Sequence, residues 1–357
     1  MTAIDPRTAG SAVDKREDAP DALDDATSTK KKRGKKDKKP TGIALLENPR
    51  KKSFAARFRN DWPLLLFALP GVIYFVTFHY LPLLGNVIAF KDYQPFIGIL
   101  ESDWVGFENF EIIFNGDPQF LNALANTMII TFLQLVFTFP APIILALLMN
   151  AMMNQTAKRI VQSILYLPHF LSWVVVVALF QSILGYNGPL WHGMAGLDLG
   201  EPNIIGNPDV FKPLLIIQDI WKSAGWGTIL FLAALAGIDA ELYEAAAVDG
   251  ASKWSQLWNV TLPGIRPVII LLLILRIGDI LSVGFEQIQL QQNAVGIQAS
   301  EVLDTYVYNN GIVAGGWGES AAVGLVKGVL AVILVLGANK LAHVFGEAGI
   351  YQGADKA

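Results

Sequence analysis

The chain has 357 residues and a formal net charge of −4; 53% of its residues are hydrophobic and 16% are charged. Soluble domains carry about 25% charged residues, so this composition is typical of a membrane protein instead. With no cysteine and only four histidines, none in a metal-binding spacing, disulfides and thiolate metal sites are excluded and no metal site is expected.

Residues 1–56 are predicted to form a disordered, basic cytoplasmic tail. An acidic, alanine-rich stretch at 18–25 precedes a dense run of lysines, STKKKRGKKDKK, at 28–39. The tail lacks the apolar centre and cleavage site of a signal peptide, so we expect it to be retained. Its lysines could mark topology or attract anionic lipid. No nucleic-acid partner is expected, because no aromatic residues interleave the lysines.

Six segments are apolar and long enough to cross a bilayer as helices, each of which needs about 20 residues. They are residues 64–90, 121–149, 161–184, 213–237, 267–289 and 320–345. Because they are too long for barrel strands, the predicted fold class is an all-α membrane protein with six transmembrane helices. This domain is expected to span 57–351, followed by a short tail at 352–357. In its last span, Gly324 and Gly328 are spaced to let another helix approach closely.

The distribution of positive charge predicts the orientation of these helices. A basic cluster precedes the first span: Arg50, Lys51, Lys52, Arg57 and Arg59. The three outer loops that follow from this orientation contain only two basic residues, Lys91 and Lys212. Both termini are therefore predicted to lie in the cytoplasm, together with the loop at 238–266.

The loop at 238–266 is predicted to form two short helices that meet at Gly250. Asp239 is suited to cap the first helix, and residues 241–247 are mostly strong helix formers. Gly250 supplies the left-handed position that ends this helix, and Ser252 can cap the second one. The loop is therefore an ordered element that lies between the fourth and fifth spans.

The second helix of this loop carries Trp254 and Trp258 on one face. Pro263 is predicted to stop it before the next span. Small residues on the first helix and a charge at Glu244 would suit docking of the loop into a groove of a partner. An amphipathic helix that lies on lipid is the alternative that the pattern leaves open.

The loop also carries a spaced motif: E-A-A, three residues, G, nine residues, I or V, one residue, L-P. It is met by Glu244, Ala245, Ala246, Gly250, Val260, Leu262 and Pro263, with valine where isoleucine is commonest. The motif resembles the signature loop of permease subunits of binding-protein-dependent ABC importers, and the resemblance extends over about 57–351. It implies a type I importer transmembrane domain in a bacterial inner membrane. It further implies that the motif residues, with Glu241, Asp249, Trp254 and Trp258, couple the chain to an ATPase.

Other segments resemble the carbohydrate branch of this family, in the maltose-permease-like superfamily, whose members import oligosaccharides or polysaccharides. They are residues 90–96, 104–110, 166–170 and 276–287. The family implies a second permease, which we expect to be a different chain, an ATPase dimer and an extracytoplasmic solute-binding protein. The chain has no G-x-x-x-x-G-K-[ST] phosphate loop. We therefore expect no catalytic residues and no bound cofactor here, with ATP and magnesium on the partner ATPase.

Polar residues within spans are costly and usually face the interior of the helix bundle. A path for sugar is expected at Trp173, Trp226, Asp279, Glu286 and Gln287, where indole rings stack on sugars and polar groups bind hydroxyls. Alternatively, Arg276 and Asp279 could form an ion pair that joins helices. Alternative functions are import of a polyol or glycerol phosphate, or secondary transport. The latter would be expected to show internal repeats, and none is seen.

Overall fold

The computed structural model of the chain describes residues 54–186, 188–195, 204–344, 346 and 349. The predicted C-terminal tail at 352–357 lies outside these residues, as does the N-terminal tail except for 54–56, which are helical. Contacts divide the chain into two units, Met1–Phe67 and Ala68–Ala357, and each is considered by itself. The described part of the first unit is the beginning of α1 (Phe54–Phe75).

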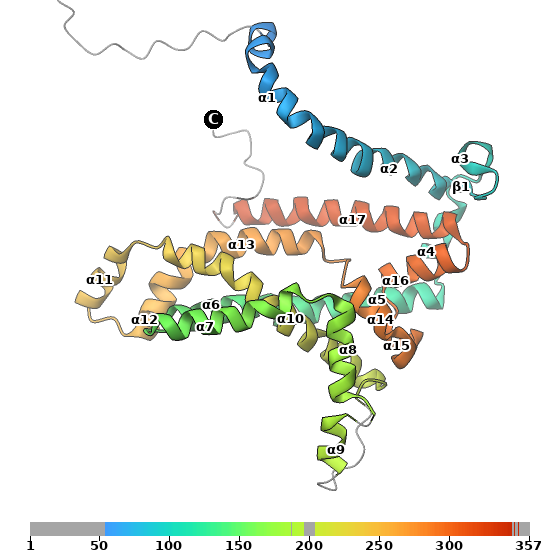
Figure 1. Cartoon of the computed structure of the whole chain (residues 1–357). Helices are drawn as coiled ribbons and strands as arrows, with labels where there is room; N and C mark the ends of the chain where they lie inside the picture. The colour runs from blue at the N-terminus through green and yellow to red at the C-terminus, as the bar shows by residue number, and fades with distance from the viewer. Residues whose placement is uncertain (1–53, 187, 196–203, 345, 347–348, 350–357) are drawn as a thin grey trace, which may run out of the picture. The chain divides into compact units, whose positions relative to one another are not determined.

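The described residues are mostly helical (Figure 1). The longer helices after α1 are α5 (Pro118–Leu133), α6 (Pro140–Asn150), α7 (Gln155–Tyr166), α8 (Trp173–Leu184), α10 (Pro208–Ala236), α11 (Ala240–Val248), α13 (Leu262–Gly278), α14 (Phe285–Val295) and α17 (Trp317–Val344). The shorter ones are α2 (Leu81–Leu83), α3 (Gly98–Glu101), α4 (Glu111–Phe114), α9 (Pro189–Ala195), α12 (Lys253–Gln256), α15 (Ile297–Ser300) and α16 (Leu303–Val307). Three segments are 3₁₀-helical, η2 (Leu84–Phe90), η3 (Glu108–Phe110) and η5 (Leu167–Phe170), and four are π-helical, η1 (Val76–Tyr80), η4 (Gln134–Thr138), η6 (Leu257–Thr261) and η7 (Tyr308–Val313).

A two-stranded antiparallel pair, β1 (Lys91–Asp92) and β2 (Asp103–Trp104), lies in the first predicted outer loop. The ring of Phe90 stacks on that of Trp104, with centroids 5.7 Å apart. Asn109 donates hydrogen bonds to two backbone carbonyls beside β1, at 3.0 Å each. Two of the segments that resemble the carbohydrate branch, residues 90–96 and 104–110, are thus in contact.

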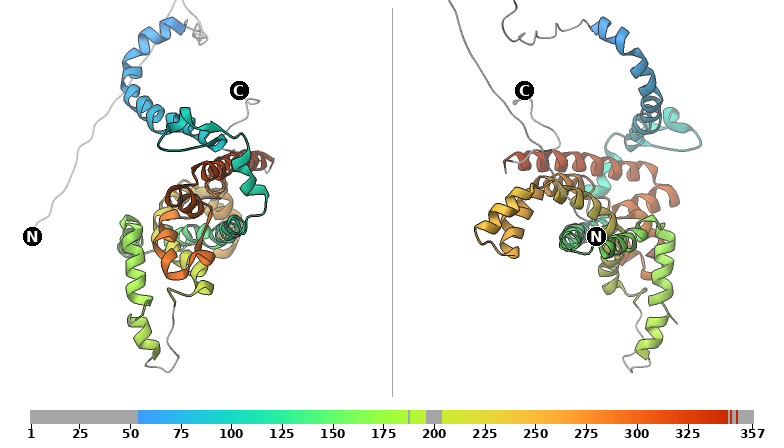
Figure 2. Two further views of the ribbon diagram at one scale, coloured as in Figure 1. Left: turned by 90° about the vertical axis from the view of Figure 1, so that its right-hand side faces the viewer. Right: turned by 60° about the vertical axis from the view of Figure 1, so that its left-hand side comes forward.

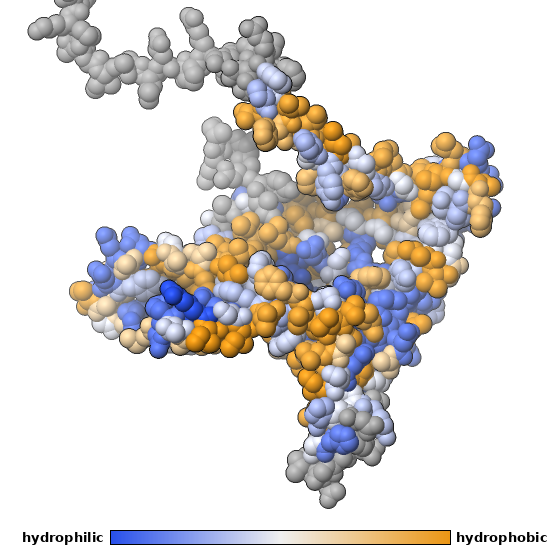
Figure 3. Space-filling model, viewed as in Figure 1, coloured by the Kyte–Doolittle hydropathy of each residue, from blue (hydrophilic) through white to orange (hydrophobic). Residues whose placement is uncertain are grey.

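Four helical segments are apolar and long enough to cross a membrane: Trp62–Phe90, Pro118–Asn150, Lys253–Gly278 and Trp317–Val344. Residues 155–184 make a fifth if the two halves, which are bent by 105°, count as one span. α10 has 29 residues and is about 43 Å long at 1.5 Å per residue, but its central polar residues lower its hydropathy. Figure 3 shows apolar side chains over much of the visible face of the helices. Six spans and the orientation remain predictions.

Two of the predicted spans are not single continuous helices. Between α7 and α8, Ser172 is extended, with φ −68° and ψ 156°, and its hydroxyl accepts a hydrogen bond from the N–H of Val175. Figure 2 shows α8 turning away from α7. The span predicted at 267–289 ends as a helix at Gly278, and α14 starts only after Gly284, whose φ is +96°. A polar cap at Ser172 and a left-handed glycine at Gly284 therefore interrupt two segments that hydropathy alone predicts to be continuous helices.

α10 lies at the centre of the hydrophobic core of the larger unit. In its N-terminal half, Phe211 and Leu215 pack against residues of α5 and α14. In its C-terminal half, Phe231 and Leu235 pack against residues of α6 and α13. Within a bilayer such packing stabilises by van der Waals contact rather than by removing apolar surface from water.

At Gly225 on α10, the absence of a side chain lets a second helix pack directly against the backbone. Gly225 lies directly against the backbone carbonyl of Leu165 in α7, where a Cβ atom would overlap that carbonyl. By contrast, no described atom lies within 4 Å of the Cβ position at Gly324 or Gly328. No described helix uses the close approach predicted at Gly324 and Gly328, and a contact with another subunit there stays a prediction.

Candidate functional site

The loop at 238–266 begins at the predicted cap. The carboxylate of Asp239 accepts a hydrogen bond from the N–H of Glu241 at 3.0 Å. This satisfies one of the N–H groups that have no partner within the first turn of a helix. Glu241, Glu244 and Ala245 are exposed along α11, whereas Ala246 is half-buried. The first helix of the loop is thus confirmed, and it leaves two acidic side chains exposed.

Gly250 ends this part of the loop in the predicted left-handed conformation, with φ +77°. The N–H groups of Gly250 and Ala251 donate to the carbonyls of Ala247 and Ala246 at 3.0 and 2.9 Å. A residue with a side chain would adopt this conformation at a cost of about 1–2 kcal/mol. No described atom lies within 4 Å of the Cβ position at Gly250, so the space beside its backbone is open.

The second part of the loop starts where Ser252 accepts a hydrogen bond from the N–H of Ser255 at 3.2 Å. Trp254 and Trp258 meet edge to face, with ring centroids 5.9 Å apart. These side chains are 68% and 55% exposed. Large apolar side chains so exposed together mark a contact surface for protein or lipid.

The two parts of the loop are tied together. The hydroxyls of Tyr243 and Thr261 lie 3.0 Å apart, and the Gln256 amide donates to the carbonyl of Ala251 at 3.3 Å. A cleft of about 700 Å³ lies between these parts and the C-terminal end of α6, with Met153 and Trp254 among its lining residues. The loop is therefore a defined structural element and not a linker.

Pro263 does not stop the second helix, contrary to the prediction. Residues Lys253–Gly278 form one continuous helical segment that passes through α12, η6 and α13. A proline has no N–H and crowds the carbonyl of the preceding turn. The π-helical turn η6 comes directly before it, and its hydrogen bonds reach back five residues instead of four, which accommodates the ring. Leu262 is partly buried against the cluster around Phe231, so it serves packing as well.

Two of the five path candidates, Trp173 and Trp226, come together at the bend between α7 and α8. The ammonium of Lys222 donates hydrogen bonds to the carbonyls of His169 and Leu171, at 2.9 and 2.7 Å. It also lies 5.5 Å from the centroid of the Trp173 ring, within the range of a cation–π contact. The ring of His169 stacks on Trp226, with centroids 4.5 Å apart. Lys222 of α10 therefore links the bend to both tryptophans.

Asp279 lies exposed at the end of α13, and no ion pair among the described residues joins it to Arg276, which was the alternative for these two residues. Instead, Nη2 of Arg276 donates to Oε1 of Gln134 at 2.7 Å. Gln134 begins the π-helical turn η4, and the hydroxyl of Thr131, one turn earlier, donates to the carbonyl of Ile280. Arg276 therefore joins α13 to η4 through an amide, and Asp279 is left open to other contacts.

Glu286 and Gln287 differ in their surroundings on α14. Glu286 is exposed, whereas Gln287 is 1% exposed. The amide of Gln287 donates to the carbonyl of Leu215 and to Oε1 of Gln218, at 3.0 and 2.8 Å. Gln218 and Gln291 exchange two further hydrogen bonds, at 3.0 and 3.1 Å. Gln287 thus belongs to a buried amide network that fastens α14 to α10.

A second polar cluster lies between α5 and the segment from α14 to η7. Glu301 is fully buried, and its Oε1 accepts hydrogen bonds from Gln119 and Asn309, at 3.1 and 3.3 Å. Burial, and then the charges of nearby carboxylates, raises the pKa of Tyr306 to about 12, so its hydroxyl stays protonated at neutral pH. Among the described residues, no group of three or more His, Asp or Glu side chains is placed to hold a metal.

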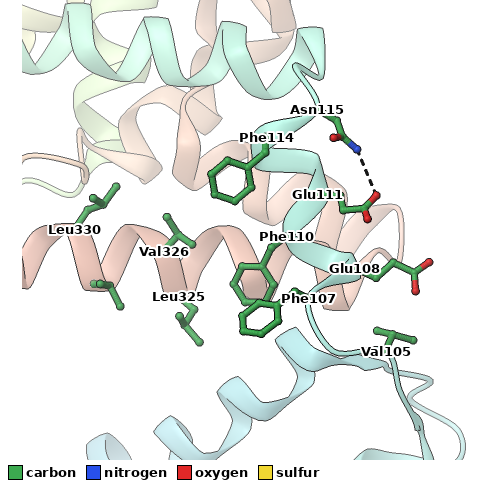
Figure 4. A pocket seen from close by; sticks show the side chains of 11 residues that line it. Val105, Phe107, Glu108, Phe110, Glu111, Phe114, Asn115, Leu325, Val326 and Leu330 are labelled. Atoms are coloured by element: carbon green, nitrogen blue, oxygen red, sulfur yellow. Dashed lines mark hydrogen bonds between the residues drawn. The ribbon is translucent and has the colours of Figure 1, made fainter.

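An apolar groove of about 910 Å³ runs between α17 and residues 105–115 (Figure 4). Phe107, Phe110 and Phe114 line one side of it, and Leu325, Val326, Val329 and Leu330 line the other. None of the residues predicted for coupling or for the sugar path lies in this groove. It stands apart from both candidate sites.

The residues predicted for the sugar path do not include Lys222 or Gln291. Lys222 is the middle residue of α10. A lysine so far from either end of a predicted span is itself a signal of function, because an intramembrane charge is costly. Gln291 had no such signal, since the predicted fifth span ended before it and placed it in a loop.

Comparison with known proteins identifies the family of the chain. Residues 118–347 match the family described as binding-protein-dependent transport system inner membrane component. The chain belongs to this family. Membership makes it a transport subunit of a membrane complex. The matched residues include the loop at 238–266 and all of α10.

Related members of this family carry carbohydrate names. The chain is 45% identical to the polygalacturonan/rhamnogalacturonan transport system permease protein YteP of Bacillus subtilis (strain 168), over 86% of this chain and 96% of that protein. It matches a chain of a bacterial ABC transporter involved in the import of the acidic polysaccharide alginate, with TM-score 0.76 and 36% identity, over 82% of this chain and 99% of that one. It also matches the alginate transporter in complex with an alginate pentasaccharide-bound periplasmic protein, with TM-score 0.76 and 35% identity, over 83% and 99%.

Proposed function

We propose that the chain is a permease subunit of an ATP-driven importer of oligosaccharides in the bacterial inner membrane. The observation that carries this proposal is the match along nearly the whole length of a polygalacturonan/rhamnogalacturonan permease and an alginate importer chain. In this proposal α10 is one of six spans, both termini lie in the cytoplasm, and a second permease of different sequence completes the path.

The loop at 238–266 would couple the chain to a separate ATPase, which binds ATP and magnesium. Its acidic α11, open Gly250 and exposed Trp254 and Trp258 offer charge, room for a close backbone and apolar contact in one element. These are the features of a helix that docks in a groove. ATP can move the chain only if it binds two arrangements of the complex with different affinity.

Cargo would pass beside Trp173 and Trp226 and the polar residues Asp279, Glu286 and Gln287. The two indole rings supply faces for stacking, and the exposed carboxylates of Asp279 and Glu286 can accept hydrogen bonds from sugar hydroxyls. Gln287 would not contact the cargo itself but would hold α14 in place through its hydrogen bond to Gln218. A solute-binding protein would deliver the cargo, as the complex of the alginate transporter with a periplasmic protein suggests.

Uptake by the reconstituted complex tests the cargo and the energy source. The chain, its ATPase, second permease and binding protein are placed in liposomes, and uptake of labelled acidic oligosaccharide, neutral oligosaccharide and glycerol phosphate is compared. We expect ATP-dependent uptake of an oligosaccharide, together with stimulation of ATP hydrolysis by the loaded binding protein. Uptake of glycerol phosphate alone, or uptake that survives removal of ATP, would refute the proposal.

The orientation can be tested directly because the chain has no cysteine. Val248 in the coupling loop is 88% exposed, and Phe96 in the first predicted outer loop is fully exposed. A maleimide that does not cross membranes should label Val248→Cys in inside-out vesicles and not in right-side-out vesicles. Phe96→Cys is the matched control and should show the reverse. Labelling of Val248→Cys from outside would place the loop away from any cytoplasmic ATPase.

A further inference from the structure

Lys222 has one hydrogen-bond donor without an acceptor among the described residues. An ammonium group has three N–H donors. Two of them go to the carbonyls of His169 and Leu171, at 2.9 and 2.7 Å. The Trp173 ring lies beside the same nitrogen, at 5.5 Å from its centroid, and accepts no conventional hydrogen bond. The remaining N–H is available to a ligand.

No described carboxylate forms an ion pair within 4 Å of Lys222, although Asp219 interacts with its charge at longer range. Asp219, one turn earlier on α10, accepts a hydrogen bond from Ser223 at 3.1 Å. The described ion pair within 4 Å is that of Lys327 and Asp304, on other helices, and no described carboxylate lies that close to Lys222. Asp219 interacts electrostatically with Arg276 and, more weakly, with Lys222. One carboxylate thus faces two cations within the helix bundle, and a negatively charged ligand would balance the second.

The surroundings of Lys222 suit a sugar ring. Trp226, one helical turn along α10, has one ring face covered by His169 but is 46% exposed, so the rest of its ring surface stays open. Phe170 meets the Trp226 ring edge to face at 5.8 Å and is 71% exposed. Lys222 and Trp226 lie four residues apart and share a face of α10. An ammonium group and open aromatic rings on one face can bind a carboxylate and the sugar ring that carries it together.

We propose that Lys222 is a specificity-determining residue, which binds a carboxylate of an acidic oligosaccharide while the ring stacks on Trp226. The proposal rests on the proposed function and adds the charge of its cargo. Lys222 has a second role, in holding the carbonyls of the bend between α7 and α8. An experiment must therefore separate recognition of charge from support of the bend.

The test compares matched pairs of oligosaccharides that differ only in charge. Trigalacturonate is paired with α-1,4-linked galactotriose, and trimannuronate with β-1,4-linked mannotriose. Equilibrium binding of each labelled sugar is measured on the purified complex without binding protein or ATP. We expect the wild type to bind the acidic member of at least one pair roughly tenfold to a hundredfold more tightly, the range for a hydrogen bond between charged groups.

Three variants locate this preference. Lys222→Gln keeps an N–H donor for the bend but removes the charge, and should bind acidic and neutral members about equally, with neutral binding unchanged. Lys222→Arg keeps the charge and should restore most of the preference. Lys212→Gln, on the same helix and half-buried like Lys222, is the matched control and should behave as wild type.

Each other result would overturn the proposal. If Lys222→Gln retains the preference for acidic sugars, the charge that selects them lies elsewhere. If Lys222→Gln loses affinity equally for acidic and neutral sugars, Lys222 only supports the bend and does not recognise charge. If the wild type binds the neutral sugars as tightly as the acidic ones, the proposal of an acidic cargo is refuted but the carbohydrate function stands. If it binds none of the four sugars, both are refuted.

Discussion

Replacement of Gly250 by valine is expected to abolish coupled transport while the chain still folds and inserts. The substitution imposes a strained left-handed backbone, at a cost of about 1–2 kcal/mol, and fills the open space beside the turn. The strain alone is small compared with the stability of a folded chain. We expect at least a tenfold loss of ATP-driven uptake, measured in liposomes, together with loss of the ATPase from the purified complex or hydrolysis without uptake.

Two further variants separate strain from docking. Gly116 has φ +76° and, like Gly250, no described atom within 4 Å of its Cβ position, but lies outside the coupling loop. Gly116→Val therefore carries similar strain and should retain uptake. Gly250→Asn adds a side chain that tolerates the left-handed conformation and should lose uptake. Wild-type uptake by Gly250→Val, or full activity of Gly250→Asn, would show that the space beside the turn is not used for docking.

Replacement of Gly225 by alanine is expected to destabilise the larger unit strongly. In an exposed helix this change is favourable by about 1 kcal/mol, because alanine is the better helix former. Here the added methyl would overlap the carbonyl of Leu165, so α10 and α7 must separate. Overpacking of this kind costs about 1–3 kcal/mol. We expect a clearly lower midpoint of thermal unfolding in detergent, and weaker support of the bend by Lys222.

Gly324→Ala supplies the matched comparison, because it is also a glycine inside a long helix but has no described neighbour at its Cβ position. Its unfolding midpoint should equal or exceed that of the wild type. The two variants are thus expected to shift the midpoint in opposite directions. A Gly225→Ala chain as stable as Gly324→Ala would mean that α7 and α10 do not approach as closely as described.

The coupling loop was predictable from sequence because local chemistry sets its structure. Asp239 and Ser252 cap helices through bonds to residues two and three positions away. Gly250 turns the chain through its own backbone freedom. Such contacts depend on neighbours in the sequence, which a reader of the sequence sees directly. The failure at Pro263 has the opposite origin, since the π-helical turn that admits it leaves no pattern in residue types.

The interior of the bundle was less predictable because its polar residues find partners far along the chain. Gln218 bonds to Gln291, 73 residues away, and Arg276 bonds to Gln134, 142 residues away. A hydropathy profile shows these residues only as polar positions in apolar spans and does not identify their hydrogen-bond partners. The contact that supports the bend after α7 has the same character, because Lys222, which binds its free carbonyls, comes from another helix.

Because the helix does not end at Pro263, the coupling loop and the fifth predicted span share one helical segment from Lys253 to Gly278. Its 26 residues correspond to about 39 Å of helix, with the π-helical turn η6 and Pro267 as the points at which it can bend. If the loop docks on an ATPase as proposed, a push on the tryptophans at one end would be passed along this segment to Arg276 near its other end. Motion at the cytoplasmic surface would then reach the polar centre through one helical segment, without an intervening loop.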